Sequence, residues 1–155
     1  MFSKRRTPAH PPVVESMGRP IIIFVTVCTD KRKPILANME AVRLLTGAWH
    51  QAGEWLVGRF VIMPDHVHLF CSPATQNPCP LMKWVAYWKS LTSKSWPRRD
   101  DFPIWQKDFW DRELRSGESY GNKWEYVRCN PVRHGLVTSP EQWSYQGELN
   151  VLRWE

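Results

Sequence analysis

The stretch WLVGRFVIMPDHVHLFCS, residues 55–72, decides the fold that we expect for this chain. Two runs rich in apolar and β-branched residues flank Pro64-Asp65, and such a dipeptide between apolar runs is typical of a tight turn. The pattern therefore predicts two strands, at 55–63 and 66–72, which pair antiparallel as a hairpin.

The segments on either side extend this hairpin to a whole fold. A β-branched run predicts a strand upstream, apolar residues at helical spacing predict helices, and an aromatic-rich run predicts a last strand. In chain order, the elements expected are a strand at 21–29, a helix at 39–52, the hairpin, a helix at 80–96, a strand at 104–114 and a helix at 116–130. This order is that of an α+β, ferredoxin-like fold: an antiparallel sheet (β-α-β-β-α-β) with helices on one face, plus a C-terminal helix.

Length and composition limit the kinds of protein to consider. A chain of 155 residues fits one domain, which we place at 20–146, with a basic, flexible arm at 1–19 and a C-terminal tail at 147–155. The 4 cysteines form no C-x-x-C pair, which argues against a zinc ribbon. We find neither a membrane-spanning run nor a signal peptide, so we expect a cytoplasmic protein without a membrane partner. The net charge of +6 points to a polyanionic partner.

Two histidines one residue apart, His66 and His68, are the first candidates for a functional site. Side chains at positions i and i+2 of a strand project from the same face, with their Cα atoms roughly 6.6 Å apart. Two imidazoles placed in this way can converge on one metal ion. The alternative is that both are polar residues on a solvated face, because two ligands alone do not make a metal site.

A third donor and a nucleophile are candidates in EYVRCNP, residues 125–131. Tyr126 and Asn130 are four residues apart, so we expect them on one face of the last helix, both facing outward. The amide of Asn130 has a carbonyl oxygen that can coordinate a cation, and Tyr126 has a hydroxyl. A tyrosine in a helix is by default a packing residue, and Tyr120 on the same helix is the strongest competitor for the role of nucleophile.

Together these motifs resemble a known family. MPDHVHLF (63–70) followed by EYVRCNPVRHGLV (125–137) is similar to the single-tyrosine HUH transposases, in which HUH denotes His-hydrophobic-His. The chain is most similar to the REP-associated tyrosine transposases, also through FVTVCT, WQKDFWDREL and WSY. Insertion-sequence relatives usually have Gln where Asn130 stands, and either amide offers a carbonyl oxygen.

The resemblance implies metal-dependent cleavage and rejoining of single-stranded DNA beside a hairpin. His66, His68 and Asn130 would hold a divalent ion, Mg²⁺ or Mn²⁺, and Tyr126 would attack the scissile phosphate to form a 5′-phosphotyrosine intermediate. The partner would then be single-stranded or hairpin DNA, and the protein a monomer or a homodimer.

Two alternative functions stay open. One is a non-catalytic regulator that binds DNA hairpins with the same fold. The other is a metal-dependent phosphoesterase in which water is the nucleophile, and for which Asp65 and Asp111 are the available extra ligands.

Basic side chains are the candidates for contact with a DNA backbone, with a solvated surface as the alternative. We select a basic group near the N-terminus, one face of the second helix and the turn after that helix. These residues are Lys4, Arg5, Arg6, Lys83, Tyr87, Lys94, Arg98 and Arg99. Trp96, Trp105 and Trp110 belong to no helical stripe, so they are candidates for stacking on unpaired bases.

Overall fold

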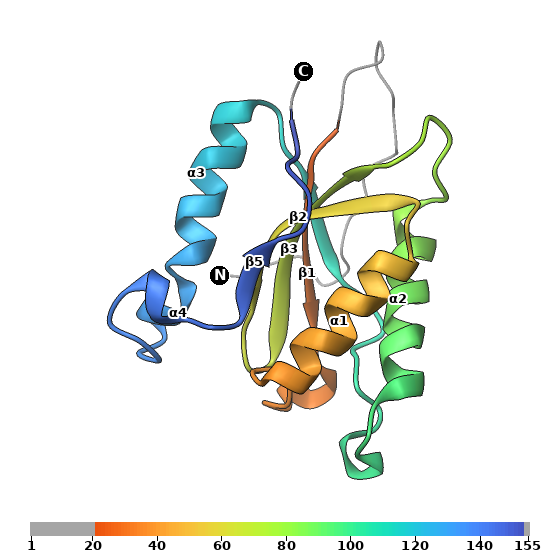
Figure 1. Cartoon of the computed structure of the whole chain (residues 1–155), viewed down its shortest axis with the longest axis vertical. Helices are drawn as coiled ribbons and strands as arrows, with labels where there is room; N and C mark the ends of the chain where they lie inside the picture. The colour runs from red at the N-terminus through yellow and green to blue at the C-terminus, as the bar shows by residue number, and fades with distance from the viewer. Residues whose placement is uncertain (1–20, 154–155) are drawn as a thin grey trace.

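The structure is a computed structural model that describes residues 21–153. Five antiparallel strands form one sheet in the order β4-β1-β3-β2-β5, with helices on both faces (Figure 1). The strands are β1 (Ile23–Cys28), β2 (Trp55–Ile62), β3 (His66–Pro73), β4 (Trp110–Glu113) and β5 (Gln146–Glu148). The helices are α1 (Met39–Gln51), α2 (Leu81–Ser95), α3 (Gly117–Arg128) and α4 (Asn130–Arg133), with short 3-10 turns η1 (Asp30–Arg32), η2 (Arg99–Asp101) and η3 (Pro140–Gln142). The predicted α+β, ferredoxin-like plan is confirmed.

A tryptophan-rich core holds α1 and α2 against one face of the sheet. Trp49 of α1 meets Trp88 of α2 edge to face, with ring centroids 5.8 Å apart, an arrangement that aromatic pairs favour. Trp88 also meets Trp105 at 5.6 Å, and both Trp105 and Trp96 are buried. These two candidates for base stacking are therefore core residues.

A second apolar core lies on the opposite face, beneath α3. Phe70 of β3 contacts Tyr120 and Trp124 of α3, with ring centroids 4.8 Å and 6.3 Å apart. Side chains alternate along a strand, so the two histidines upstream of Phe70 also lie on the α3 face. The face that carries the histidines is therefore partly covered by α3, and His66 itself is buried.

The C-terminal residues belong to the fold instead of forming the expected tail. The predicted boundary at 146 falls inside β5, which pairs with the edge strand β2. Beyond β5, Leu152 is buried in the second core. The predicted strand at 104–114 is shorter than expected, because only Trp110–Glu113 pairs with β1 and Trp105 makes an isolated bridge to Thr29.

Pro131 ends α3, as predicted, but the chain enters a second short helix at once. A proline has no backbone N–H and its ring blocks the preceding turn, so α3 cannot continue through it. Pro131 fits instead in the first turn of α4, where that N–H is not needed. The break at Cys129 thus separates the helix that carries Tyr126 from the one that carries Asn130.

The arm at 1–19, with Lys4, Arg5 and Arg6, lies outside the described residues. Among the helices within 21–153, none has the length and apolar character needed to cross a bilayer.

Candidate active site

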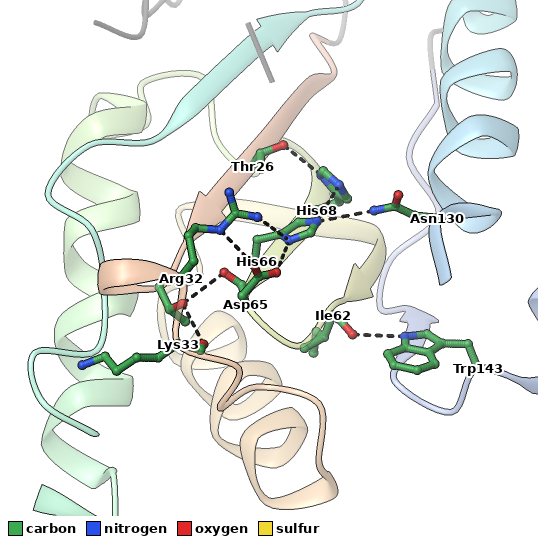
Figure 2. A network of polar contacts seen from close by, with 10 residues as sticks. Thr26, Arg32, Lys33, Ile62, Asp65, His66, His68, Asn130 and Trp143 are labelled. Carbon is green, nitrogen blue, oxygen red and sulfur yellow. Dashed lines mark hydrogen bonds and ion pairs between the residues drawn. The ribbon is translucent and has the colours of Figure 1, made fainter. Parts of the chain in front are cut away.

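The two histidines point their Nε2 atoms at each other (Figure 2). These atoms are 3.2 Å apart, and the rings meet edge to face. The opposite ring atoms are engaged elsewhere: His66 Nδ1 lies 2.7 Å from Asp65 Oδ1, and His68 Nδ1 lies 2.8 Å from Thr26 Oγ1. If both Nδ1 atoms carry protons, two Nε2 lone pairs face each other, and they repel unless a cation or a proton lies between them.

Asp65 is a support for His66 and lies behind the ring, away from His68. Its second oxygen, Oδ2, accepts a hydrogen bond of 3.0 Å from Arg32 Nε, so the carboxylate is fixed from two sides. A carboxylate on the far nitrogen of a histidine fixes the tautomer and the ring orientation, as is common behind metal ligands. This position does not fit the direct ligand role that the phosphoesterase alternative would require of Asp65.

The surroundings of both histidines lower their pKa values and so favour the neutral form. Burial lowers the pKa of His66, although Asp65 opposes the shift, and Arg32 and His134 add to it. Burial also lowers the pKa of His68 well below its ordinary value, with further lowering by His66 and by the cations Lys123, Arg133 and Arg32. Neutral imidazole is the form that binds metal ions.

Asn130 lies against the histidine pair instead of facing outward with Tyr126, which corrects the sequence prediction. Its side chain is buried, and Nδ2 lies 3.4 Å from His66 Nε2 (Figure 2). The reason is the helix break: Asn130 begins α4 and does not continue the face of α3 on which Tyr126 lies. On the other side of the amide, Arg133 donates a hydrogen bond of 3.3 Å to Asn130 Oδ1.

Tyr126 remains accessible beside this cluster. Its exposed fraction is 54%, and the guanidinium of Arg133 lies over its ring, 3.8 Å from the centroid. Arg133 therefore touches both the amide of Asn130 and the ring of Tyr126. Tyr120 has a different environment: it packs on Phe70, and burial raises the pKa of its hydroxyl despite the nearby Arg59. Of the two tyrosines, only Tyr126 is well exposed to an incoming substrate.

The donor set of this cluster fits a divalent cation. Cis ligands placed about 2.1 Å from an octahedral ion lie roughly 3 Å apart, close to the separations of the side-chain nitrogens here. Within the described residues no three His, Cys, Asp or Glu side chains group to hold a metal, so the third donor would be the amide of Asn130. Rotation of the Asn130 amide by 180° about its Cβ–Cγ bond exchanges Nδ2 for Oδ1. The phosphoesterase candidate Asp111 is buried and pairs across the sheet with Val25, which faces α1 and α2.

The other predicted DNA contacts do not gather at this cluster. Lys83, Tyr87 and Lys94 are exposed on α2, which covers the face of the sheet opposite to α3 (Figure 1). Arg98 is paired with Glu40 at 2.9 Å and with Asp101 at 3.1 Å, and Arg99 is exposed in η2.

Sequence reasoning missed Thr26, Arg32 and Arg133, and it named Asp65 only as an extra ligand for the phosphoesterase alternative. Arg133 lies three residues after Asn130, so it carried a local signal. Thr26 and Arg32 carried none, because their positions depend on the pairing of β1 with β3 and on the turn η1.

Comparison with known proteins identifies relatives of the chain. No family model matches it. A Haemophilus influenzae protein, named provisionally as a REP-associated tyrosine transposase, is 28% identical over 139 residues, or 81% of this chain and 77% of its own length. An Escherichia coli protein named REP-associated tyrosine transposase is 25% identical over 89 residues, which cover 57% of this chain and 52% of the relative.

Solved structures share the fold. A REP-associated tyrosine transposase solved in complex with a REP hairpin aligns with a TM-score of 0.69 at 20% identity, over 94% of this chain and 82% of its own. A Deinococcus radiodurans protein, provisionally named a transposase, aligns with a TM-score of 0.52 at 16% identity, over 76% of this chain and 95% of its own.

Proposed function

We propose that this chain cleaves and rejoins single-stranded DNA. The proposal is supported by its similarity to proteins named REP-associated tyrosine transposases, the family that its motifs resemble. The substrate that we propose is a strand flanking a hairpin repeat, by analogy with the relative solved in complex with a REP hairpin. His66, His68 and Asn130 would hold a divalent cation, Mg²⁺ or Mn²⁺. When bound, the cation would supply a Lewis acid for the scissile phosphate.

One observation carries this proposal: two imidazoles that face each other adjoin a buried amide and an exposed tyrosine on the same side of the sheet. The Nε2 atoms are 3.2 Å apart, and Asn130 Nδ2 lies 3.4 Å from one of them. Arg133 joins this cluster to Tyr126 through its contacts with the amide and the ring. A regulator that only bound DNA would have no need of this arrangement.

The proposed reaction uses Tyr126 as the nucleophile. Its Oη forms a bond to phosphorus, the bond from phosphorus to the 3′ oxygen breaks, and the phenol loses its proton while the leaving oxygen gains one. The products are a 5′-phosphotyrosine and a strand with a free 3′ hydroxyl. Because the phosphodiester energy is kept in the new bond, the same or another 3′ hydroxyl reverses the step without ATP.

The test is a denaturing gel of protein incubated with a labelled hairpin oligonucleotide that has a single-stranded flank, with Mg²⁺ or Mn²⁺. We expect the unaltered chain to form a covalent DNA adduct, Tyr126→Phe to form none, and the control Tyr120→Phe to form it as the unaltered chain does. Chelation of the cation is expected to abolish the adduct.

The same experiment distinguishes the alternatives. Hairpin binding by the unaltered chain without any adduct would favour the regulator. DNA cleavage that persists in Tyr126→Phe would favour a phosphoesterase with water as the nucleophile. An adduct that persists in Tyr126→Phe and disappears in Tyr120→Phe would move the role of nucleophile to Tyr120.

A further inference from the structure

A groove of about 630 Å³ lies beside Tyr126, between β4 and α3. Its lining includes Arg112 and Glu113 of β4, Arg115 from the loop that follows, and Asn122, Lys123 and Tyr126 of α3. None of these residues was a candidate for DNA contact from the sequence, apart from the tyrosine itself. Arg112 pairs across the sheet with Phe24, so it lies on the face that also carries His68.

Among the described lining residues, the cations Arg112, Arg115 and Lys123 outnumber the carboxylate of Glu113. Among the described side chains, no ion pair joins Arg112, Arg115, Lys123 or Arg133 to an acidic group. Some arginines elsewhere do have such partners, for example Arg128, which pairs with two glutamates. Burial lowers the pKa of Lys123, and the charges of Arg112 and Arg133 lower it further, so these cations repel one another.

Lys123 connects the groove to the histidine cluster through the ring of Phe24. The ammonium of Lys123 lies 4.8 Å from the ring centroid of Phe24 and 5.4 Å from that of Tyr126. Phe24 in turn stacks on His68, with ring centroids 5.3 Å apart. Lys123 thus contacts both Phe24, which stacks on the candidate metal ligand His68, and the candidate nucleophile Tyr126. Arg112 and Arg115 line the same groove.

We propose that this groove, and not the exposed face of α2, binds the phosphodiester backbone of the single strand that flanks the scissile phosphate, with Lys123 nearest the reacting group and Arg115 farther along. A groove in which cations outnumber carboxylates favours a ligand that carries repeated negative charges, as a phosphodiester backbone does. The identity of the ligand as single-stranded DNA rests on the proposed function, whereas the placement of the phosphate contacts rests on the charges of the groove.

The experiment measures binding of a labelled single-stranded oligonucleotide by fluorescence anisotropy, in a Tyr126→Phe background in which no adduct forms. The groove pair Arg115→Gln/Lys123→Gln is compared with the control pair Arg43→Gln/Lys107→Gln, which removes the same charge from exposed positions outside the groove. We expect the groove pair to weaken binding about tenfold at 50 mM salt and to reduce the slope of log affinity against log salt by about 1.4, or 0.7 for each lost contact. The control pair should change neither value.

Equal weakening by the two pairs would overturn the proposal, because it would reflect net charge alone; so would unchanged binding by the groove pair. Thermal unfolding of each variant shows whether the fold is intact. The charge reversal Arg115→Glu, at an exposed position, provides a second test of DNA binding. The proposed function and the proposed groove can fail separately. If the chain with Tyr126 intact forms the covalent adduct but the groove pair binds DNA as before, only the groove is rejected. Weakened binding without any adduct rejects the transferase and keeps the groove as a nucleic-acid site.

Discussion

Asp65 is the single residue on which the geometry of the histidine pair most depends. Its carboxylate accepts a hydrogen bond from His66 Nδ1 at 2.7 Å and is itself fixed by Arg32 at 3.0 Å. Burial alone would raise the pKa of Asp65, but the hydrogen bonds and charges of His66 and Arg32 lower it below its ordinary value. The lowered pKa favours the ionised carboxylate of Asp65 at neutral pH.

We expect Asp65→Asn to weaken binding of Mn²⁺ by about 10- to 100-fold, because an amide does not fix the tautomer of His66 as a carboxylate does. Isothermal titration with Mn²⁺ measures the change. Asp108→Asn, at an exposed position outside the site, is the control and should leave the affinity as it was. Unchanged affinity in Asp65→Asn would mean that the carboxylate plays no part in holding the ligand.

The lowered pKa values of the histidines predict a loss of stability in mild acid. Below pH 6.5, the ordinary histidine value, the unfolded chain binds protons at His66 and His68 that the folded chain does not. Protonation therefore favours the unfolded state, and the free energy of unfolding should fall as the pH drops from 7 toward 5. Above pH 7 the two histidines should add no pH dependence.

Urea unfolding in metal-free buffer between pH 8 and 5 measures this dependence. A variant with both His66→Asn and His68→Asn serves as the reference, since it lacks the two groups and should show a shallower decline in acid. If the decline is as steep in that variant as in the unaltered chain, the protons are bound elsewhere.

For individual residues, the sequence predicted the identity of the candidate site residues better than the positions of their side chains. The alternation of β3 correctly put the two histidines on one face, since that pattern depends only on strand geometry. The outward position expected for Asn130 was wrong, because four-residue spacing implies a shared face only within an unbroken helix. Lys123 and Arg112 gave no signal, because they are far apart in the sequence and their proximity depends on how α3 packs on the sheet.

At the scale of elements, the short helix α4 fixes the position of Asn130. Gly135 closes α4 with a φ of 72°, in the left-handed region, and its backbone N–H donates to Val132 at 2.9 Å. Glycine adopts this conformation without strain, whereas a side chain there meets the following carbonyl.

We expect Gly135→Ala to lower the free energy of unfolding by about 1–2 kcal/mol. The matched control is Gly47→Ala in α1: a Cβ has open space at both glycines, but Gly47 has helical geometry, so alanine should stabilise the chain by about 0.5–1 kcal/mol. Urea unfolding measures both changes. A similar effect of the two substitutions would show that backbone conformation does not account for the difference.

Elements with local signals were predicted well, and those that depend on tertiary contacts were not. The helix predicted at 39–52 begins beside Asn38, whose side chain caps α1 by accepting a hydrogen bond of 2.8 Å from Ala41 N–H, a contact within one turn. The strand β5, of sequence QGE, has neither β-branched residues nor alternation, so nothing local predicts it. It forms because the exposed edge of β2 accepts a partner.

At the scale of the whole molecule, the last described residues join the edge of the sheet to the core beneath α3. An added Cβ at Gly58 of β2 would lie 2.6 Å from Leu152, so the absence of a side chain there leaves the space that Leu152 fills. Leu152 is 8% exposed and belongs to the same core as Phe70 and Val127.

We expect Leu152→Ala to lower the free energy of unfolding by about 2–3 kcal/mol, through the loss of buried methyl groups and the cavity left behind. Val151→Ala, at a position that is 65% exposed, should change it by less than about 0.5 kcal/mol. Urea unfolding of the full chain compares the two. Equal, small effects would indicate that the C-terminal segment does not contribute to the stability of the domain.

The distribution of tryptophans between the two faces of the sheet has a spectroscopic consequence. Six indoles, those of Trp49, Trp55, Trp84, Trp88, Trp96 and Trp105, are buried in the core beneath α1 and α2, away from the histidine pair and the basic groove. The intrinsic fluorescence of the protein should thus be dominated by emitters that a nucleic acid on the α3 face never touches. Unfolding should shift the emission to longer wavelength, while ligand binding should leave most of the signal unchanged, so a binding assay needs its dye on the DNA.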